Sequence, residues 1–282
     1  MNYLKSAGML IVGCSLAHGA ACVNAPLSTY VNNGNFFSCT EGNGALTVQF
    51  NQSILPSWAA LSLLSGNNSS VDPANINVVV GNLGLAFDSN DFVENTGLLS
   101  SQAELVQFFL DGGSNSISDV LLSFDSLSVA ANGLGTGLAI GQELLCLGGS
   151  FTTLPTGLVT SVANGVLGTG NFGCSGIVLV GTAAVSSGPL GVITSLLALP
   201  NLSGVSDHAD ILLGSYNATQ VDVIKMQALV SVTGGSASDD GFANSYTLAT
   251  PEPGSATFLL CGCLLFGMAA ILRRRTASPV RD

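Results

Sequence analysis

Positive charge is what this sequence has least of. Asp, Glu, Lys and Arg make up only 8% of its 282 residues. Between residues 22 and 249, Lys225 is the single basic side chain against fifteen acidic ones, so one positive and fifteen negative charges give a formal net of −14. Partners with a phosphate backbone, and anionic membrane surfaces, are bound through clusters of Lys and Arg. The composition therefore excludes nucleic acid as a partner of this segment.

Groups that catalyse nucleophilic or metal-assisted reactions are also scarce. Ser206 and Asp207 precede His208, the one imidazole of residues 22–249, but sequence neighbours rarely form a catalytic triad and no GxSxG motif is present. Residues 168–173 match GxGxxG, yet a strand rather than a helix is expected after them, which argues against a nucleotide site. The Cys residues include no CxxC pair, which argues against a metal site. We expect a polar turn at residues 206–210, no catalytic residue, no cofactor and no metal.

Two acidic segments leave calcium binding open as an alternative. Asp88, Asp91 and Glu94 form one of them, and residues 239–241 form the other. Carboxylate oxygens suit Ca²⁺, but Phe92 and Val93 break the EF-hand pattern. We expect solvated acidic loops at both places. The fifteen acidic residues could also supply a carboxylate pair for glycoside cleavage, but the sequence singles out no pair.

The hydrophobic pattern predicts short strands. Residues 119–130 are expected to form one strand, with side chains that alternate around Val120, Leu122 and Phe124, and residues 102–110 favour a strand over a helix. Because such segments are separated by Asn, Gly, Ser and Asp, the sequence predicts an all-β fold, an antiparallel β-sandwich. The other expected strands are residues 45–50, 76–80, 83–87, 143–147, 177–185, 221–232 and 246–249.

Four Cys residues remain once the termini are set aside. They are Cys22, Cys39, Cys146 and Cys174. Four Cys allow three pairings, and in an oxidising compartment pairing is expected. We favour the two short closures, Cys22 with Cys39 and Cys146 with Cys174.

The N-terminus has the features of a secretory signal peptide. Lys5 supplies the positive flank, residues 7–17 are apolar, and small residues follow up to Ala21. We expect residues 1–21 to be removed. A lipid-modified Cys14 or Cys22 is the alternative, but the apolar stretch before Cys14 is short and Cys22 lacks a large aliphatic residue upstream.

The C-terminus contains a long apolar run. Residues 256–272 carry no charge, and as a helix they would span about 25 Å, close to the hydrocarbon thickness of a bilayer. Arg273, Arg274 and Arg275 follow, and positive residues stay on the cytoplasmic side. The sequence therefore predicts three parts: a signal peptide (1–21), an ectodomain (22–249) outside the membrane, and a tail (250–282) with one transmembrane helix.

Pro251, Glu252 and Pro253, placed directly before this apolar run and the Arg cluster, resemble the PEP-CTERM sorting signal of diderm bacteria. Thr250 departs from the apolar residue that often precedes the motif. The resemblance implies recognition by exosortase, a membrane-embedded cysteine protease-transferase of bacteria that make exopolysaccharide, and removal of the tail. The ectodomain is also similar to exported PEP-CTERM proteins of unassigned function, which carry no known catalytic residues.

These observations predict a non-enzymatic protein of the cell surface or extracellular matrix. Its expected partners are the secretion machinery, exosortase and the inner membrane, through which it passes as an anchored intermediate, with exopolysaccharide as a further candidate. The alternative is a polysaccharide- or calcium-binding module. Ice binding is opposed by the lack of Thr-x-Thr ladders, and a secreted hydrolase is the last alternative.

Overall fold

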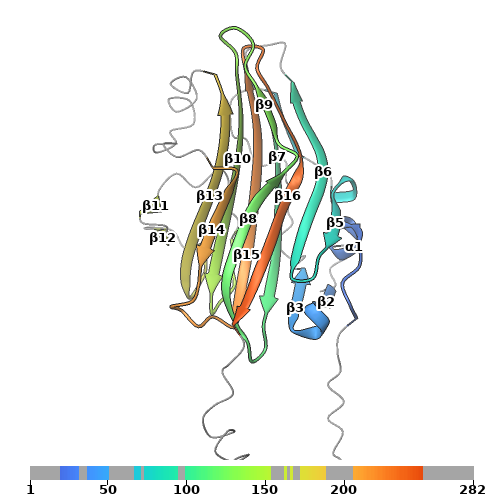
Figure 1. Ribbon diagram of the computed structural model, residues 1–282, viewed down its shortest axis with the longest axis vertical. Coiled ribbons are helices and arrows are strands. Elements are labelled where there is room, and N and C mark those ends of the chain that lie inside the picture. Colours follow the sequence, from blue (N-terminus) through green and yellow to red (C-terminus); the bar gives the residue numbers. More distant parts are fainter. Residues whose placement is uncertain are drawn as a thin grey trace, which may run out of the picture.

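Two β-sheets pack face to face, with their strands along the long axis of the molecule (Figure 1). The computed structural model describes residues 20–31, 37–50, 67–70, 73–94, 99–153, 162–163, 166–167, 172–188 and 206–249. Among the described strands, all pairs are antiparallel except β4 with β7, and the two sheets agree with the predicted all-β sandwich.

The β16 sheet contains the C-terminal strand of the described chain. In spatial order it consists of β1 (Ala25–Pro26), β5 (Asn77–Val80), β6 (Gly84–Glu94), β16 (Ser236–Ala249), β8 (Ser116–Asp125) and β14 (His208–Leu212). The short β9 (Ser128–Ala130) also pairs with β16.

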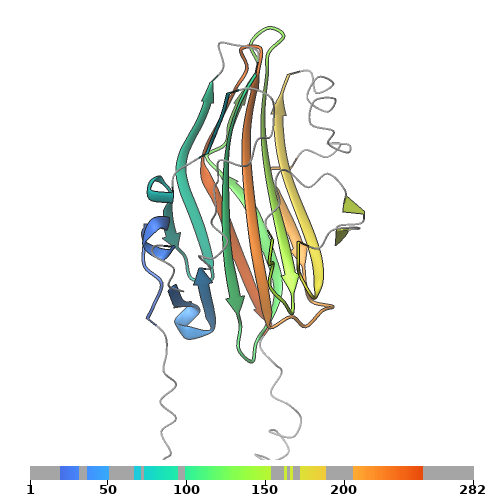
Figure 2. The same ribbon diagram turned by 180° about the vertical axis from the view of Figure 1, so that it is seen from behind.

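The β15 sheet forms the other layer, and its long strands lie side by side in Figure 2. In spatial order it consists of β11 (Val162–Ala163), β12 (Val166–Leu167), β13 (Ile177–Ser187), β10 (Thr136–Leu147), β15 (Gln220–Val232), β7 (Leu99–Asp111), β3 (Leu46–Phe50) and β2 (Phe37–Glu41). β4 (Asn67–Ser70) runs parallel to β7. Within the described residues the strands are accompanied by the short helices α1 (Leu27–Tyr30), η1 (Gly42–Gly44) and η3 (Pro73–Asn75).

Every segment predicted as a strand lies within or largely within an observed one, but three details were wrong. Residues 119–130 form two strands rather than one, because Ser126 has a φ of 53° and interrupts the extended backbone. Residues 206–210 are not a turn throughout, since β14 begins at His208. The two acidic segments are not loops: both lie within strands, in β6 and β16.

Alternating side chains of β15 explain why the chain carries so much apolar sequence. Val221 and Val223 face the space between the sheets, where Phe108 and Phe242 also pack. Ile224 and its apolar neighbours face the opposite side and form a second buried cluster. Because both faces of the strand are buried, apolar residues occur at successive positions instead of at alternate ones, and the polar residues Asp222, Lys225 and Gln227 are buried among them.

Both expected disulfides are present. Cys22 pairs with Cys39, 17 residues away, and Cys146 pairs with Cys174, 28 residues away. Disulfides persist in oxidising compartments, so these two bonds indicate an extracytoplasmic environment.

The segments from which sorting was predicted lie outside the described residues. These are most of the expected signal peptide, Pro251 to Pro253, residues 256–272 and the Arg cluster at 273–275. Among the residues that are described, none belongs to a helix with the length and apolar character needed to cross a bilayer.

Candidate functional site

A layer of polar side chains is buried between the sheets, where a sandwich normally holds only apolar groups. Lys225 on β15 and Glu143 on β10 lie directly opposite each other in the antiparallel register, and both are 0% exposed. Asn244 on β16 faces them from the other sheet and is 3% exposed. Since buried charged groups are rare unless they serve as partners or reactants, this cluster is the main candidate site.

Aromatic rings surround the amine of Lys225. Its Nζ lies 4.6 Å from the ring centroid of Phe242 and 5.9 Å from that of Phe87. No hydrogen bond to Nζ comes from any residue that the structure describes. Burial lowers the pKa of Lys225 to about 7, although the carboxyl groups of Glu143 and Glu104 act in the opposite direction. The neutral amine is therefore well populated near neutral pH.

Glu143 connects the two sheets. The Nδ2 of Asn244 donates a hydrogen bond to Glu143 Oε1 at 2.6 Å and another to the carbonyl of Leu121 at 3.2 Å. Burial raises the pKa of the Glu143 carboxyl, and this effect exceeds the opposing effects of Lys225 and Asn244. Burial therefore disfavours the charged form of both the acid and the amine.

The polar layer continues along β15 beyond this cluster. Gln227 lies opposite Glu104 in the register with β7, and both are at most 2% exposed. The Nε2 of Gln227 donates to Asp239 Oδ2 at 2.6 Å, which adds a hydrogen bond between β15 and β16 to the one between β10 and β16. The layer thus ties the sheets together by polar contacts on either side of Phe242.

A separate buried acid, Asp222, points to the outer side of the β15 sheet. It accepts hydrogen bonds from Gln107 Nε2 at 3.0 and 3.1 Å and from the backbone N–H of Phe151 at 2.7 Å. Burial raises the pKa of Asp222 to about 6 in spite of these donors. Asp222 is also the register partner of Cys146. Its role is structural, because it holds the Phe151 backbone against the disulfide.

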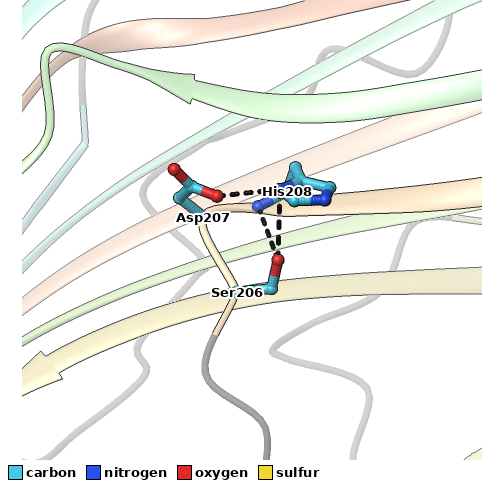
Figure 3. Close-up of polar contacts among 3 residues, drawn as sticks. All are labelled: Ser206, Asp207 and His208. Atoms are coloured by element: carbon cyan, nitrogen blue, oxygen red, sulfur yellow. Dashed lines mark hydrogen bonds and ion pairs between the residues drawn. The ribbon is translucent and has the colours of Figure 1, made fainter.

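The Ser206, Asp207 and His208 side chains do meet, but not as a catalytic triad (Figure 3). Asp207 Oδ1 lies 2.8 Å from Nδ1 of His208, and Ser206 Oγ lies 3.2 Å from the same nitrogen. In a triad the acid and the nucleophile hold opposite ring nitrogens. The Asp207 and His208 side chains are also 74% and 57% exposed. The group is a solvated polar contact at the start of β14.

The structure brings together the two acidic segments considered for calcium. Asp91 pairs with Asp239, and Asp88 pairs with Gly241 beside a bulge in β16. Burial raises the pKa of Asp88, followed by the charges of Asp125 and Asp240. Within the described residues, however, no group of three acidic, His or Cys side chains is arranged to hold a metal ion.

One carboxylate pair bears on the hydrolase alternative. Asp119 on β8 shares a side-chain hydrogen bond with Asp210 on β14, and its pKa is raised to about 6, mainly by burial and then by this contact. Glycosidases hold their two carboxyl groups roughly 5 Å or more apart to admit the substrate. Two acids in direct hydrogen-bond contact do not have that arrangement.

An open cleft of about 540 Å³ lies beside the Cys22–Cys39 disulfide and is lined in part by Glu41, Gly42, Asn43 and Asn82. Glu41 Oε2 accepts a hydrogen bond from the Gly84 N–H at 3.0 Å. Burial raises the pKa of Glu41 to about 7 despite that donor. Glu41 is thus held by the fold, and nothing in the cleft selects a ligand.

The Lys225 cluster is not predicted from the sequence. The sequence marks Lys225 only as the single basic residue of residues 22–249, although its position among Val223, Ile224 and Met226 is a signal that the amine is buried. Glu143 and Asn244 are 101 residues apart, and only the pairing of strands brings them together. No family model, curated protein or solved structure matches this chain.

Proposed function

We propose that this chain is an exported, non-enzymatic protein of the cell surface or extracellular matrix, delivered through its C-terminal sorting signal. The observation that carries the proposal is a doubly disulfide-bonded sandwich that ends directly before that signal. Disulfides of this kind persist outside the cytoplasm. β16, the last strand of the described residues, ends at Ala249, and Pro251 follows two residues later.

The position of that strand end supports a role for the tail in retention. β16 runs along the sandwich and ends at one extremity of its long axis (Figure 1). A membrane segment joined at this point would leave both sheets clear of the bilayer. The stiff Pro251-Glu252-Pro253 stretch would then lie between the folded domain and the membrane, where exosortase could reach it.

The chemistry of the described residues supports a structural or interaction role. The Ser206–His208 contact lacks triad geometry, and the hydrogen-bonded Asp119–Asp210 pair lacks the separation used by glycosidases. The domain instead contains two disulfides, and side-chain hydrogen bonds join strands in its interior. These links suit a protein whose task is to persist outside the cell.

The test is a change of the motif in the full chain, expressed in an exosortase-containing host. Replacing Pro251, Glu252 and Pro253 by Ala should leave a membrane-bound protein that retains residues 250–282, detected by fractionation and intact mass. The matched control is Ser278→Ala, beyond the Arg cluster, which should be processed like the wild type. If the triple variant were processed and located like the control, the sorting proposal would be wrong.

A further inference from the structure

Three side chains from three strands converge between the sheets. Lys225 on β15 lies opposite Glu143 on β10, and Glu143 accepts a hydrogen bond from Asn244 on β16. The Lys225 amine lies 4.6 Å from the ring centroid of Phe242, which is two positions before Asn244 and therefore on the same face of β16. The amine and the carboxamide are thus gathered around one carboxyl group.

Each of these three residues also keeps a buried polar atom with no hydrogen-bond partner among the described residues. The atoms are Lys225 Nζ, Glu143 Oε2 and Asn244 Oδ1. Folded proteins leave few such atoms, and each one calls for an explanation. Here three such atoms lie in one cluster, on an amine, a carboxyl group and an amide. These are the groups that an acyl transfer needs: a nucleophile, a proton-transferring acid and an acyl donor.

The surroundings favour that reaction. An amine attacks a carbonyl only in its neutral form, and the apolar, aromatic surroundings lower the pKa of Lys225 to about 7. A protonated carboxyl can donate a proton to an amide, and burial raises the pKa of Glu143. The fold holds the groups together, so the reaction needs no encounter between separate molecules.

We propose that Lys225 and Asn244 become joined by an intramolecular amide bond, formed in the folded sandwich with Glu143 as the proton-transferring group. The Nζ lone pair attacks Cγ of Asn244. The new C–N bond forms as the Cγ–Nδ2 bond breaks, Glu143 moves a proton from Nζ to Nδ2, and ammonia leaves. The step is a transamidation in which nothing is oxidised or reduced.

The product would link β15 of one sheet to β16 of the other. It would supply the unpartnered Nζ with a covalent neighbour and replace a buried amine by a neutral amide. Together with the two disulfides, it would give the sandwich three covalent cross-links, of which this one alone resists reducing agents. Such a bond would suit a protein that works outside the cell. The proposal of the bond does not depend on the sorting proposal.

Lys225 makes the proposal easy to test, because it is the only basic residue between Lys5 and Arg273. The full chain is exported, purified, reduced and denatured, and then digested with a protease that cuts after Lys. The protease does not cut after an acylated Lys, so the wild type should stay uncut after Lys225. Its intact mass should fall about 17 Da below that of the reduced sequence, the mass of the ammonia released when the amine displaces the amide nitrogen.

Three variants complete the experiment. Asn244→Ala and Glu143→Gln should both have the full sequence mass and be cut at Lys225, whereas Ser245→Ala, at the exposed neighbouring position, should behave like the wild type. Mass and cleavage are measured on denatured chains, so the wild-type result does not depend on the variants. It remains decisive even if a variant fails to fold. A wild type with unchanged mass that is cut at Lys225 would overturn the proposal. So would a loss of about 18 Da with the link mapped to Glu143 or Glu104, since a carboxyl acceptor releases water instead.

Discussion

Removing the Cys146–Cys174 disulfide should destabilise the sandwich more than removing Cys22–Cys39. The first bond closes 28 residues and the second 17. In the chain-entropy model these closures contribute about 3.6 and about 3.1 kcal/mol. Cys146 and Cys174 are also both 0% exposed and pack with Phe151 in the outer cluster. Their loss should therefore cost about 4 kcal/mol or more in total.

The assay compares the full chain with the double variants Cys146→Ala/Cys174→Ala and Cys22→Ala/Cys39→Ala. Guanidinium unfolding followed by circular dichroism gives the free energy of unfolding of each. The first variant should also melt about 8–16 °C below the wild type, as a loss of this size predicts for a domain of this length. If it lost less than about 1 kcal/mol, the role assigned to this closure would be refuted. The same follows if the order of the two variants were reversed.

Two further changes probe the buried groups. The pKa of Asp222 is raised to about 6 from an ordinary value of 3.8, so its protonated form favours folding at low pH and that stability is lost as pH rises through 6. Asp222→Asn should therefore remove on the order of 3 kcal/mol of the decline in unfolding free energy between pH 4 and 7, and identical pH profiles would contradict this. Phe108 is 0% exposed and its ring centroid lies 5.7 Å from that of Phe87. Phe108→Ala should cost about 3–5 kcal/mol in urea unfolding, and a cost below about 1 kcal/mol would show that this core does not hold the sheets together.

The strands could be predicted where side chains alternate or run apolar, as in β8 and β15. They were missed or shortened where polar residues interrupt the pattern. β16 extends over Ser236–Ala249, although its first half contains Asp239, Asp240 and Gly241. These residues resemble a loop in the sequence, but β16 remains paired on both sides of a bulge at Asp240: Asp239 has a register partner in β6, and Gly241 has one in β6 and one in β8. Tertiary pairing, rather than local preference, decides such a strand.

The Cys pairing could be predicted because short closures limit the choices, whereas the Lys225 cluster could not. Its members belong to strands in two different sheets, and the register that aligns Glu143 with Lys225 depends on the complete fold. The sequence does indicate that Lys225 is unusual, since it is the only base of its segment and lies among Val and Ile. It does not indicate which acid and which amide it meets.

The pH dependence of stability would also report on the amide bond. A free Lys225 has a pKa lowered to about 7 in the folded state, against an ordinary pKa of 10.5. Its contribution to stability is therefore complete only above pH 10.5, and it is lost as the pH falls through 7. An acylated Lys225 does not titrate. The wild type should therefore lack the rise in stability between pH 7 and 10 that a free buried amine would produce.

The central claim, that this sandwich is exported and sorted through its tail, is tested most directly by one comparison. It is the intact mass and cellular location of the mature protein from host cells with and without their exosortase. With the enzyme, the account predicts a surface or matrix protein that begins near Cys22 and has lost the apolar segment at 256–272. Without it, the protein should keep that segment and remain in the inner membrane. The same mass and the same location in both strains would contradict the account.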